Sequence, residues 1–270
     1  MEKENFAEVN GLQLYYDIQG KGDPLILLHG GYGTTDMFGP VREAIAQDRQ
    51  TIGVELQGHG HTADIDRPLR FQSMADDIAG LIDLLGFEKV DLFGYSLGGG
   101  VALRTAIQYP GKVRKLILVS TPFKQAGWFP EVLVGMHSQQ EPAAAEQMKH
   151  TPLYEIYTRI APRPQDWPLL VGKTGRLLSQ EYDWSDEISK IQAQALLVYG
   201  DHDSISPAHM AEFFQLLGGG LKDAGWDGSG MTSARLAILP GTTHYSIFTS
   251  PRLAEAVIQF LQEPVPQGSR

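Results

Sequence analysis

Hydrophobic and polar positions follow two different rhythms along this chain. Short continuous apolar runs between turn residues are typical of strands buried on both faces of a sheet. Such runs occupy residues 24–30, 50–56, 89–95, 115–121, 194–200 and 234–241. Residues 12–18 (LQLYYDI) alternate instead between two turn signals, which predicts an antiparallel edge strand.

Segments with helical periodicity separate these predicted strands. In residues 71–86, for example, apolar side chains recur at Met74, Ile78 and Leu81 until Gly86 ends the pattern. Similar segments span residues 37–48, 97–110, 207–220 and 250–262. Buried strands that alternate with helices predict a mostly parallel sheet covered on both faces.

Two stretches interrupt the alternation. Residues 122–190 contain no strand candidate but hold helical segments and many aromatic residues, which predicts a helical cap inserted in the core. The alternative is a helical insertion that only adds stability. Residues 218–233 are rich in glycine and predict a long surface loop. The predicted domains are therefore a core of 1–121 and 191–263, the cap, and a disordered tail at 264–270.

Composition narrows the class of protein. Hydrophobic residues make up 42% of the 270 residues and charged residues 20%, which is typical of a globular protein. The net charge of -10, without a cluster of Lys and Arg, argues against nucleic-acid binding. No apolar run reaches the roughly 18–20 residues of a membrane span, and the charged start argues against a signal peptide, so we expect a cytoplasmic protein. The absence of cysteine excludes disulfides and thiolate chemistry.

Candidate chemistry begins at residues 92–103 (LFGYSLGGGVAL), where Ser96 stands in a G-x-S-x-G pattern. A predicted buried strand precedes it and a predicted helix follows it, which is the context of a nucleophile elbow. The flanking glycines leave room for a strained turn that exposes the serine hydroxyl. The backbone N–H of Leu97, at the start of the helix, then faces the place where an oxyanion would form.

A serine hydroxyl needs a base and an acid to become a nucleophile. Asp201 and Asp203 both follow a predicted strand, and one of them is expected to be a turn or N-cap residue. His244 lies in a loop between the last strand and the last helix. The chain order Ser, Asp, His is the hydrolase order.

Four motifs in register resemble the α/β-hydrolase fold family, and in particular its serine esterase and cofactor-free haloperoxidase-like branch. They are HGGYG (29–33), GYSLGG (94–99), GDHDSISP (200–207) and GTTHY (241–245). The resemblance covers nearly the whole chain outside the cap. It implies a mostly parallel eight-stranded sheet flanked by helices, a helical cap and no cofactor.

The same resemblance implies roles for individual residues. Asp203 becomes the acid and Asp201 a structural residue, while Gly31 supplies the second oxyanion N–H and His29 is structural. Ser96 with His244 then implies hydrolysis of a small-molecule carboxylic ester through an acyl-enzyme. Lactonase, C–C hydrolase, aminopeptidase and perhydrolase activities remain alternatives on the same three residues.

The substrate pocket is less well defined by the sequence. Tyr32 and Tyr95 flank the oxyanion and nucleophile positions, which makes them pocket candidates. The cap aromatics either line the pocket or form the cap's own core; they are Trp128, Phe129, Tyr154 and Trp167.

One stretch departs from the family pattern. Relatives often carry Asp-x-Arg-Gly-x-Gly-x-Ser after the fourth strand, whereas this chain reads ELQGHGHT at 55–62. The role of that arginine in holding the loop is therefore in doubt here. His59, His61, Asp64 and Asp66 are spaced like metal ligands, but no further set of histidines accompanies them, so we expect a loop and no metal.

Overall fold

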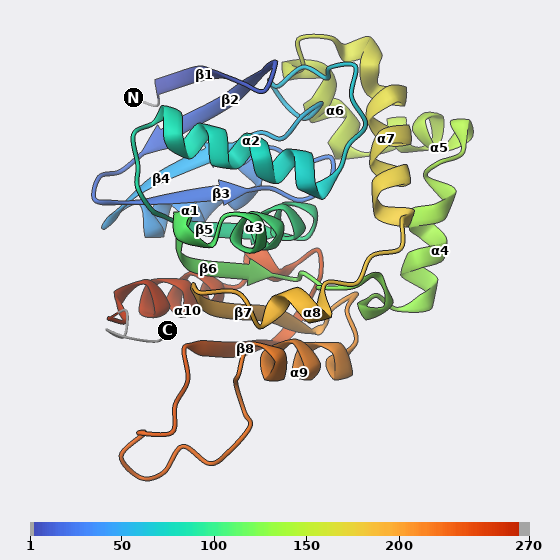
Figure 1. The fold of residues 1–270 in the computed structure, drawn as a ribbon. Helices are drawn as coiled ribbons and strands as arrows, with labels where there is room; N and C mark the ends of the chain where they lie inside the picture. Colours follow the sequence, from blue (N-terminus) through green and yellow to red (C-terminus); the bar gives the residue numbers. More distant parts are fainter. Residues whose placement is uncertain (1–2, 265–270) are drawn as a thin grey trace.

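The computed structural model describes residues 3–264, and an eight-stranded sheet runs through it (Figure 1). The spatial order is β1-β2-β4-β3-β5-β6-β7-β8. β2 runs antiparallel to β1 and β4, and the strands from β3 to β8 are parallel. The predicted mostly parallel sheet is thus confirmed. The strands are β1 (Lys3–Val9), β2 (Leu12–Gln19), β3 (Asp23–Leu28), β4 (Arg49–Val54), β5 (Val90–Tyr95), β6 (Val113–Val119), β7 (Gln194–His202) and β8 (Ala234–Thr243).

The prediction that residues 12–18 form the edge strand is wrong, because β1 pairs with β2 on its outer side. The hydrophobic pattern of the sequence does not predict β1. In this strand Ala7 and Val9 are buried while Phe6 and Glu8 are exposed. The few apolar residues and the charged neighbours conceal that two-residue period in the sequence.

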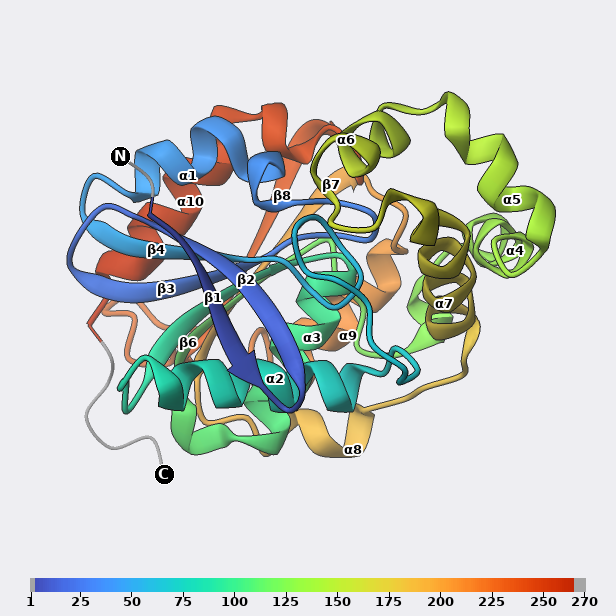
Figure 2. The same cartoon turned by 90° about the horizontal axis from the view of Figure 1, so that it is seen from above.

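Helices cover both faces of the sheet (Figure 2). α1 (Gly39–Ile45) and α10 (Pro251–Gln262) pack on one face. α2 (Phe71–Leu84), α3 (Leu97–Gln108) and α9 (Pro207–Leu216) pack on the other. Short 3-10 helices span Thr35–Phe38, Pro110–Lys112, Gln125–Gly127, Met148–His150, Pro164–Asp166 and Ile247–Thr249.

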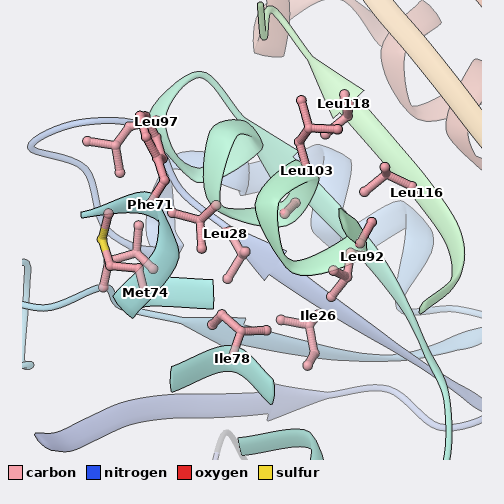
Figure 3. Close-up of a cluster of buried hydrophobic side chains, with 14 of the residues drawn as sticks. Ile26, Leu28, Phe71, Met74, Ile78, Leu92, Leu97, Leu103, Leu116 and Leu118 are labelled. Carbon is pink, nitrogen blue, oxygen red and sulfur yellow. The ribbon is translucent and has the colours of Figure 1, made fainter. Parts of the chain in front are cut away.

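The core follows the two-residue period of the strands. Ile26 and Leu28 of β3 point toward α2 and α3, where Figure 3 shows them among other buried side chains. Leu25 and Leu27 of the same strand belong to the cluster with α1 and α10. A strand such as β3 is therefore packed on both of its faces. This close packing fixes the carboxyl ends of the central strands, where polar side chains follow.

The insertion between β6 and β7 contains four helices that lie beyond the carboxyl ends of the parallel strands (Figures 1 and 2). They are α4 (Pro130–Ser138), α5 (Pro142–Gln147), α6 (Pro152–Ile160) and α7 (Trp167–Ser179). The two ends of the predicted 122–190 cap pack on the core instead. Phe123, Trp128 and Trp184 join the main core cluster, together with Ile188 of α8 (Ser185–Ile188). The cap remains a prediction, and below the word cap names the segment from α4 to α7.

Two further segments complete the picture. Residues 218–233 form a surface loop without helix or strand between α9 and β8, as predicted, and Trp226 on it is fully exposed. Of the predicted tail at 264–270, all but Pro264 lies outside the described residues. Between residues 3 and 264, no helix is long and apolar enough to cross a bilayer.

Candidate active site

Ser96 occupies a strained position between β5 and α3. Its backbone angles are φ 52° and ψ −115°, a conformation that costs a non-glycine residue about 1–3 kcal/mol. The glycines on either side make this turn possible. A Cβ on Gly94 would lie 2.5 Å from the Gly98 carbonyl oxygen, and one on Gly98 would lie 2.3 Å from the Leu28 carbonyl oxygen.

Ser96, His244 and Asp203 come from three loops at the same edge of the sheet and form a hydrogen-bonded chain. The Ser96 Oγ lies 3.1 Å from His244 Nε2. His244 Nδ1 lies 3.0 Å from Asp203 Oδ1. His244 and Asp203 are both buried, while the Ser96 hydroxyl remains partly accessible. Because Asp203 accepts a hydrogen bond from the Nδ1–H of His244, the Nε2 of a neutral His244 carries no proton and can accept the one from Ser96.

The environment of Asp203 favours its carboxylate form. Burial alone would raise the pKa of Asp203, but its contacts with His244, Ser120 and the Gly200 backbone hold that pKa below the usual value. Oδ2 accepts from the Ser120 hydroxyl at 2.5 Å and from the Gly200 N–H at 3.1 Å. Ser120 was missed in the sequence. It ends the apolar run of β6, so the same argument that selects Asp203 could have selected it.

Asp201, the other candidate acid, does a different task. Its Oδ1 accepts from the backbone N–H groups of Gly241 (2.8 Å) and Thr242 (3.2 Å). It therefore ties the end of β7 to the end of β8, directly before the loop that carries His244. Tyr95 supports the same loop, because its hydroxyl donates to the His244 carbonyl oxygen at 2.8 Å.

The two residues expected to supply the oxyanion N–H groups, Gly31 and Leu97, approach each other. Leu97 is the first residue of α3, and its Cδ1 is 3.8 Å from where a Cβ of Gly31 would stand. Gly31 lies in a turn closed by a 3.1 Å hydrogen bond from the Gly33 N–H to the Gly30 carbonyl. The next residue, Tyr32, has a positive φ of 62°.

His29 anchors this turn from below. Its Nε2 accepts from the Leu56 N–H at 3.1 Å, so Nδ1 carries the proton and donates to the Gly30 carbonyl at 2.7 Å. Burial, with a further contribution from His59, lowers the pKa of His29 to about 3. The ring therefore stays neutral and fixed between the ends of β3 and β4.

A cavity of about 570 Å³ opens above Ser96 and His244. Tyr32 and Tyr95 line it, as the sequence suggested. Its other walls come mainly from the cap, where the lining residues follow no recognisable motif. They are Gly31, Met37, Glu131, Val132, Gly135, Met136, Gln139, Met148, Leu153, Leu178 and Tyr245.

The four aromatic residues of the 122–190 insertion that were candidates for the pocket do not line this cavity. Trp167 and Tyr154 pack with Tyr157 in the cap's own apolar cluster, where large rings fill the space between α6 and α7. Trp128 lies in the main core and packs edge-on against the His244 ring, with 5.3 Å between the ring centroids. The backbone N–H of Phe129 donates to Ser204 just before α4 begins. The pocket role of these four residues stays a prediction, and the cavity above Ser96 is lined by the residues named above.

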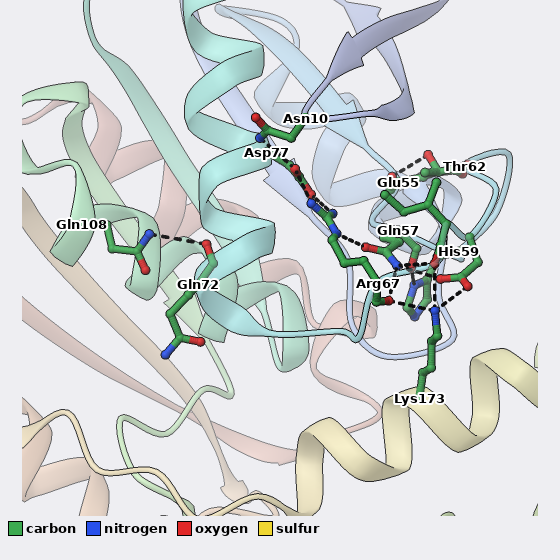
Figure 4. A network of polar contacts seen from close by, with 12 residues as sticks. Asn10, Glu55, Gln57, His59, Thr62, Arg67, Gln72, Asp77, Gln108 and Lys173 are labelled. Carbon is green, nitrogen blue, oxygen red and sulfur yellow. Dashed lines mark hydrogen bonds and ion pairs between the residues drawn. The ribbon is translucent and has the colours of Figure 1, made fainter.

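The loop after β4 forms a polar network in place of the family's arginine (Figure 4). Gln57 donates to Asp64 at 2.7 Å and accepts from Arg67 at 2.7 Å, and Arg67 also pairs with Asp77 of α2. Lys173 of α7 donates to Asp64 Oδ2 at 2.6 Å. The Asp64 carboxylate is therefore engaged by side chains of the chain itself. Within residues 3–264 no group of three or more His, Asp or Glu side chains is arranged to hold a metal.

Comparison with known proteins places this site in a wider group. The family model of the alpha/beta hydrolase fold matches residues 23–251 of the sequence. The serine hydrolase BPHL of Homo sapiens is 28% identical over 212 residues, which cover 76% of this chain and 72% of that protein.

Solved structures agree on the fold. A thermophilic esterase from Thermogutta terrifontis superposes with a TM-score of 0.73 at 23% identity, covering 97% of this chain and 98% of that one. The enol-lactonase from Burkholderia xenovorans LB400 gives a TM-score of 0.73 at 21% identity over 96% and 100%. Since the family description spans most of the chain and the sheet order matches the implied fold, the chain belongs to the alpha/beta hydrolase fold family.

Proposed function

We propose that this hydrolase cleaves carboxylic esters of small molecules through an acyl-enzyme formed on Ser96. The observation that carries the proposal is the chain of contacts from Ser96 Oγ to His244 Nε2 (3.1 Å) and from His244 Nδ1 to Asp203 (3.0 Å) beneath an open cavity. This is the geometry that makes a serine hydroxyl nucleophilic.

Each group then has a defined task. Ser96 Oγ attacks the ester carbonyl carbon while its proton passes to His244 Nε2, and Asp203 orients and stabilises the imidazolium. The N–H groups of Gly31 and Leu97 hold the oxyanion. The imidazolium then protonates the leaving alkoxide, and a water activated by the same histidine releases the acid and restores Ser96. The reaction needs only side chains, backbone and water. A cytoplasmic location stays a prediction.

The lining of the cavity suits a substrate whose acyl or alcohol group is apolar and uncharged. Its walls include Met136, Met148 and Leu178, which are flexible or branched aliphatic groups without charge. Methionine adapts to irregular shapes, so we expect several chain lengths to be accepted. A lactone is a cyclic ester and would pass through the same steps.

The test is a panel of p-nitrophenyl esters of increasing chain length and a lactone, with fluorophosphonate labelling followed by peptide mass spectrometry. We expect label on Ser96, and loss of both label and turnover in Ser96→Ala. Ser229→Ala, on the exposed glycine-rich loop, is the matched control and should behave as wild type. Full esterase activity in Ser96→Ala, or labelling that His244→Ala leaves undiminished, would contradict the proposed mechanism.

A further inference from the structure

The turn that presents the Gly31 N–H is strained, and the cap holds it. Tyr32 follows Gly31 and has φ 62°, a conformation that favours glycine or asparagine. An L-residue with a large side chain keeps such an angle only when its surroundings enforce it. The contacts of the Tyr32 side chain therefore bear on where Gly31 points.

Those contacts come from the cap. The Tyr32 hydroxyl donates to Gln139 Oε1 at 2.8 Å, just after α4 ends. The Tyr32 ring packs on Trp167, with 5.8 Å between ring centroids. Burial raises the pKa of Tyr32 above its usual range, so the hydroxyl keeps its proton and remains a donor.

Gln139 is itself firmly placed, because α7 packs directly on its backbone. A Cβ on Gly175 would lie 2.8 Å from the Gln139 carbonyl carbon, so only glycine permits this approach. The preceding residue of α7, Thr174, has its methyl group 3.7 Å from the position of a Cβ on Gly31. One turn of α7 thus packs on the Gln139 backbone and approaches Gly31.

The opposite side of the turn is held by the core. The Gly30 N–H donates to the Met37 sulfur at 3.2 Å, and a Cβ on Gly33 would lie 2.9 Å from that sulfur. The turn is therefore clamped between a core contact beneath it and cap contacts above it. Only the cap contacts depend on how α4 and α7 are seated.

We propose that the cap completes the oxyanion hole, with Gln139 acting through Tyr32 as the positioning residue for the Gly31 N–H. This inference rests on the proposed function, since it assigns Gly31 a role in ester hydrolysis. It links the position of the cap to the chemistry. If the cap moves away from the core, Tyr32 loses its contacts and the strained turn relaxes. The hole is then formed only when the cap encloses the cavity.

The test is a double-mutant cycle with Tyr32→Phe and Gln139→Leu, which remove the donor and the acceptor separately. Both variants should lower kcat about fivefold with KM within about twofold, the loss expected for one hydrogen bond that acts on the transition state. A trifluoromethyl ketone with the acyl chain of the substrate adds Ser96 Oγ to its carbonyl and places an oxyanion in the hole. Its Ki should weaken by the same factor as kcat.

The double variant should be no worse than either single variant, because the two share one interaction. Gln140→Leu, an exposed neighbour, is the matched control and should match wild type. Losses that multiply in the double variant, or a ketone Ki that stays at the wild-type value, would overturn the inference.

Labelling separates this inference from the proposed function. A wild-type protein that neither hydrolyses esters nor takes fluorophosphonate on Ser96 refutes the proposed function itself. A wild type labelled at Ser96, with a Tyr32→Phe variant that has wild-type kcat and ketone Ki, refutes only the role of Gln139 and Tyr32.

Discussion

The two walls of the candidate active site are built in different ways. The core wall carries Ser96, Asp203 and His244, each at the end of a parallel strand or in the loop that follows it, and each hydrogen-bonded. The cap wall consists mainly of aliphatic side chains and methionines from the segment α4 to α7, with few polar side chains facing the cavity. One wall is polar and dictated by sheet geometry; the other is apolar and adaptable.

This difference separates chemistry from selectivity. Strand ends can be placed within tenths of an ångström because the sheet beneath them is close-packed. Cap helices pack against one another through a small cluster of their own and reach the core at a few points. We therefore expect substitutions in the core wall to abolish turnover. Substitutions in the cap wall should change which esters are hydrolysed, except at Gln139, whose contact with Tyr32 links it to the chemistry.

The largest effect is expected at Asp203. Asp203→Asn keeps the shape but removes the charge, and its amide can donate to His244 Nδ1 and stabilise the wrong tautomer. We expect kcat for a p-nitrophenyl ester to fall about 10³- to 10⁴-fold. Asp201→Asn, two residues away, is the matched control; its amide oxygen still accepts from Gly241, so turnover should fall less than about threefold. Equal losses in the two variants would contradict the assignment.

The second effect tests how the cap is attached. Lys173 of α7 donates to Asp64 and to the carbonyls of Ile65 and Arg67 at 2.6–2.9 Å, and both charged side chains are largely buried. Lys173→Met removes the positive charge that pairs with the buried Asp64 carboxylate and one of the donors to each carbonyl, so the free energy of unfolding should fall by about 3 kcal/mol.

Urea unfolding measures this change. Lys149→Met removes an ion pair to Glu146 on the cap surface and should leave the unfolding midpoint unchanged. If both lysine variants unfold at the wild-type urea concentration, the network in Figure 4 does not anchor the cap.

How much could be predicted differs between the two walls for a physical reason. Ser96, Asp203 and His244 were found because each stands after an apolar run that must be a buried strand, and parallel strands bring their carboxyl ends together. Trp167 and Tyr154 could not be assigned, since an aromatic residue in a helical insertion serves the insertion's own core equally well. The structure places them there.

The misread edge strand has a similar origin. Among residues 5–9 of β1 the buried side chains are the small ones of Ala7 and Val9, and the sequence of the strand is mostly polar. The pocket residues Met136, Met148 and Gln139 carry no pattern, because their position depends on how α4 and α7 pack in three dimensions. Contacts such as Tyr32 with Gln139 span more than a hundred residues and have no local signal.

A smaller effect concerns acid stability, which we expect to arise in the core. Burial lowers the pKa of His29 to about 3 and of His59 and His209 to about 4. The unfolded chain binds these protons near pH 6.5, before the folded protein does, so stability is lost as the pH falls from about 6.5 toward 4.

Between pH 6 and pH 5 each of these histidines should lower the free energy of unfolding by about 1 kcal/mol. Urea unfolding at several pH values measures the slope. His59→Gln should flatten it by one histidine's share, even if the variant is less stable at pH 7. A slope that is the same in wild type and variant would show that His59 is protonated in the folded protein.

The smallest effect tests the charge of the cap wall. Glu131 of α4 is exposed at the cavity and, apart from His244, is the only ionisable group other than tyrosine among the described lining residues. It should repel a substrate carboxylate, so mono-p-nitrophenyl adipate should react more slowly than p-nitrophenyl hexanoate of the same chain length. Glu131→Gln should narrow the ratio of the two kcat/KM values about threefold at low salt, and less at high salt where charges are screened. Glu141→Gln, at an exposed residue between α4 and α5 that does not line the cavity, is the matched control. A ratio that Glu131→Gln leaves unchanged would mean that the cap wall selects esters by shape alone.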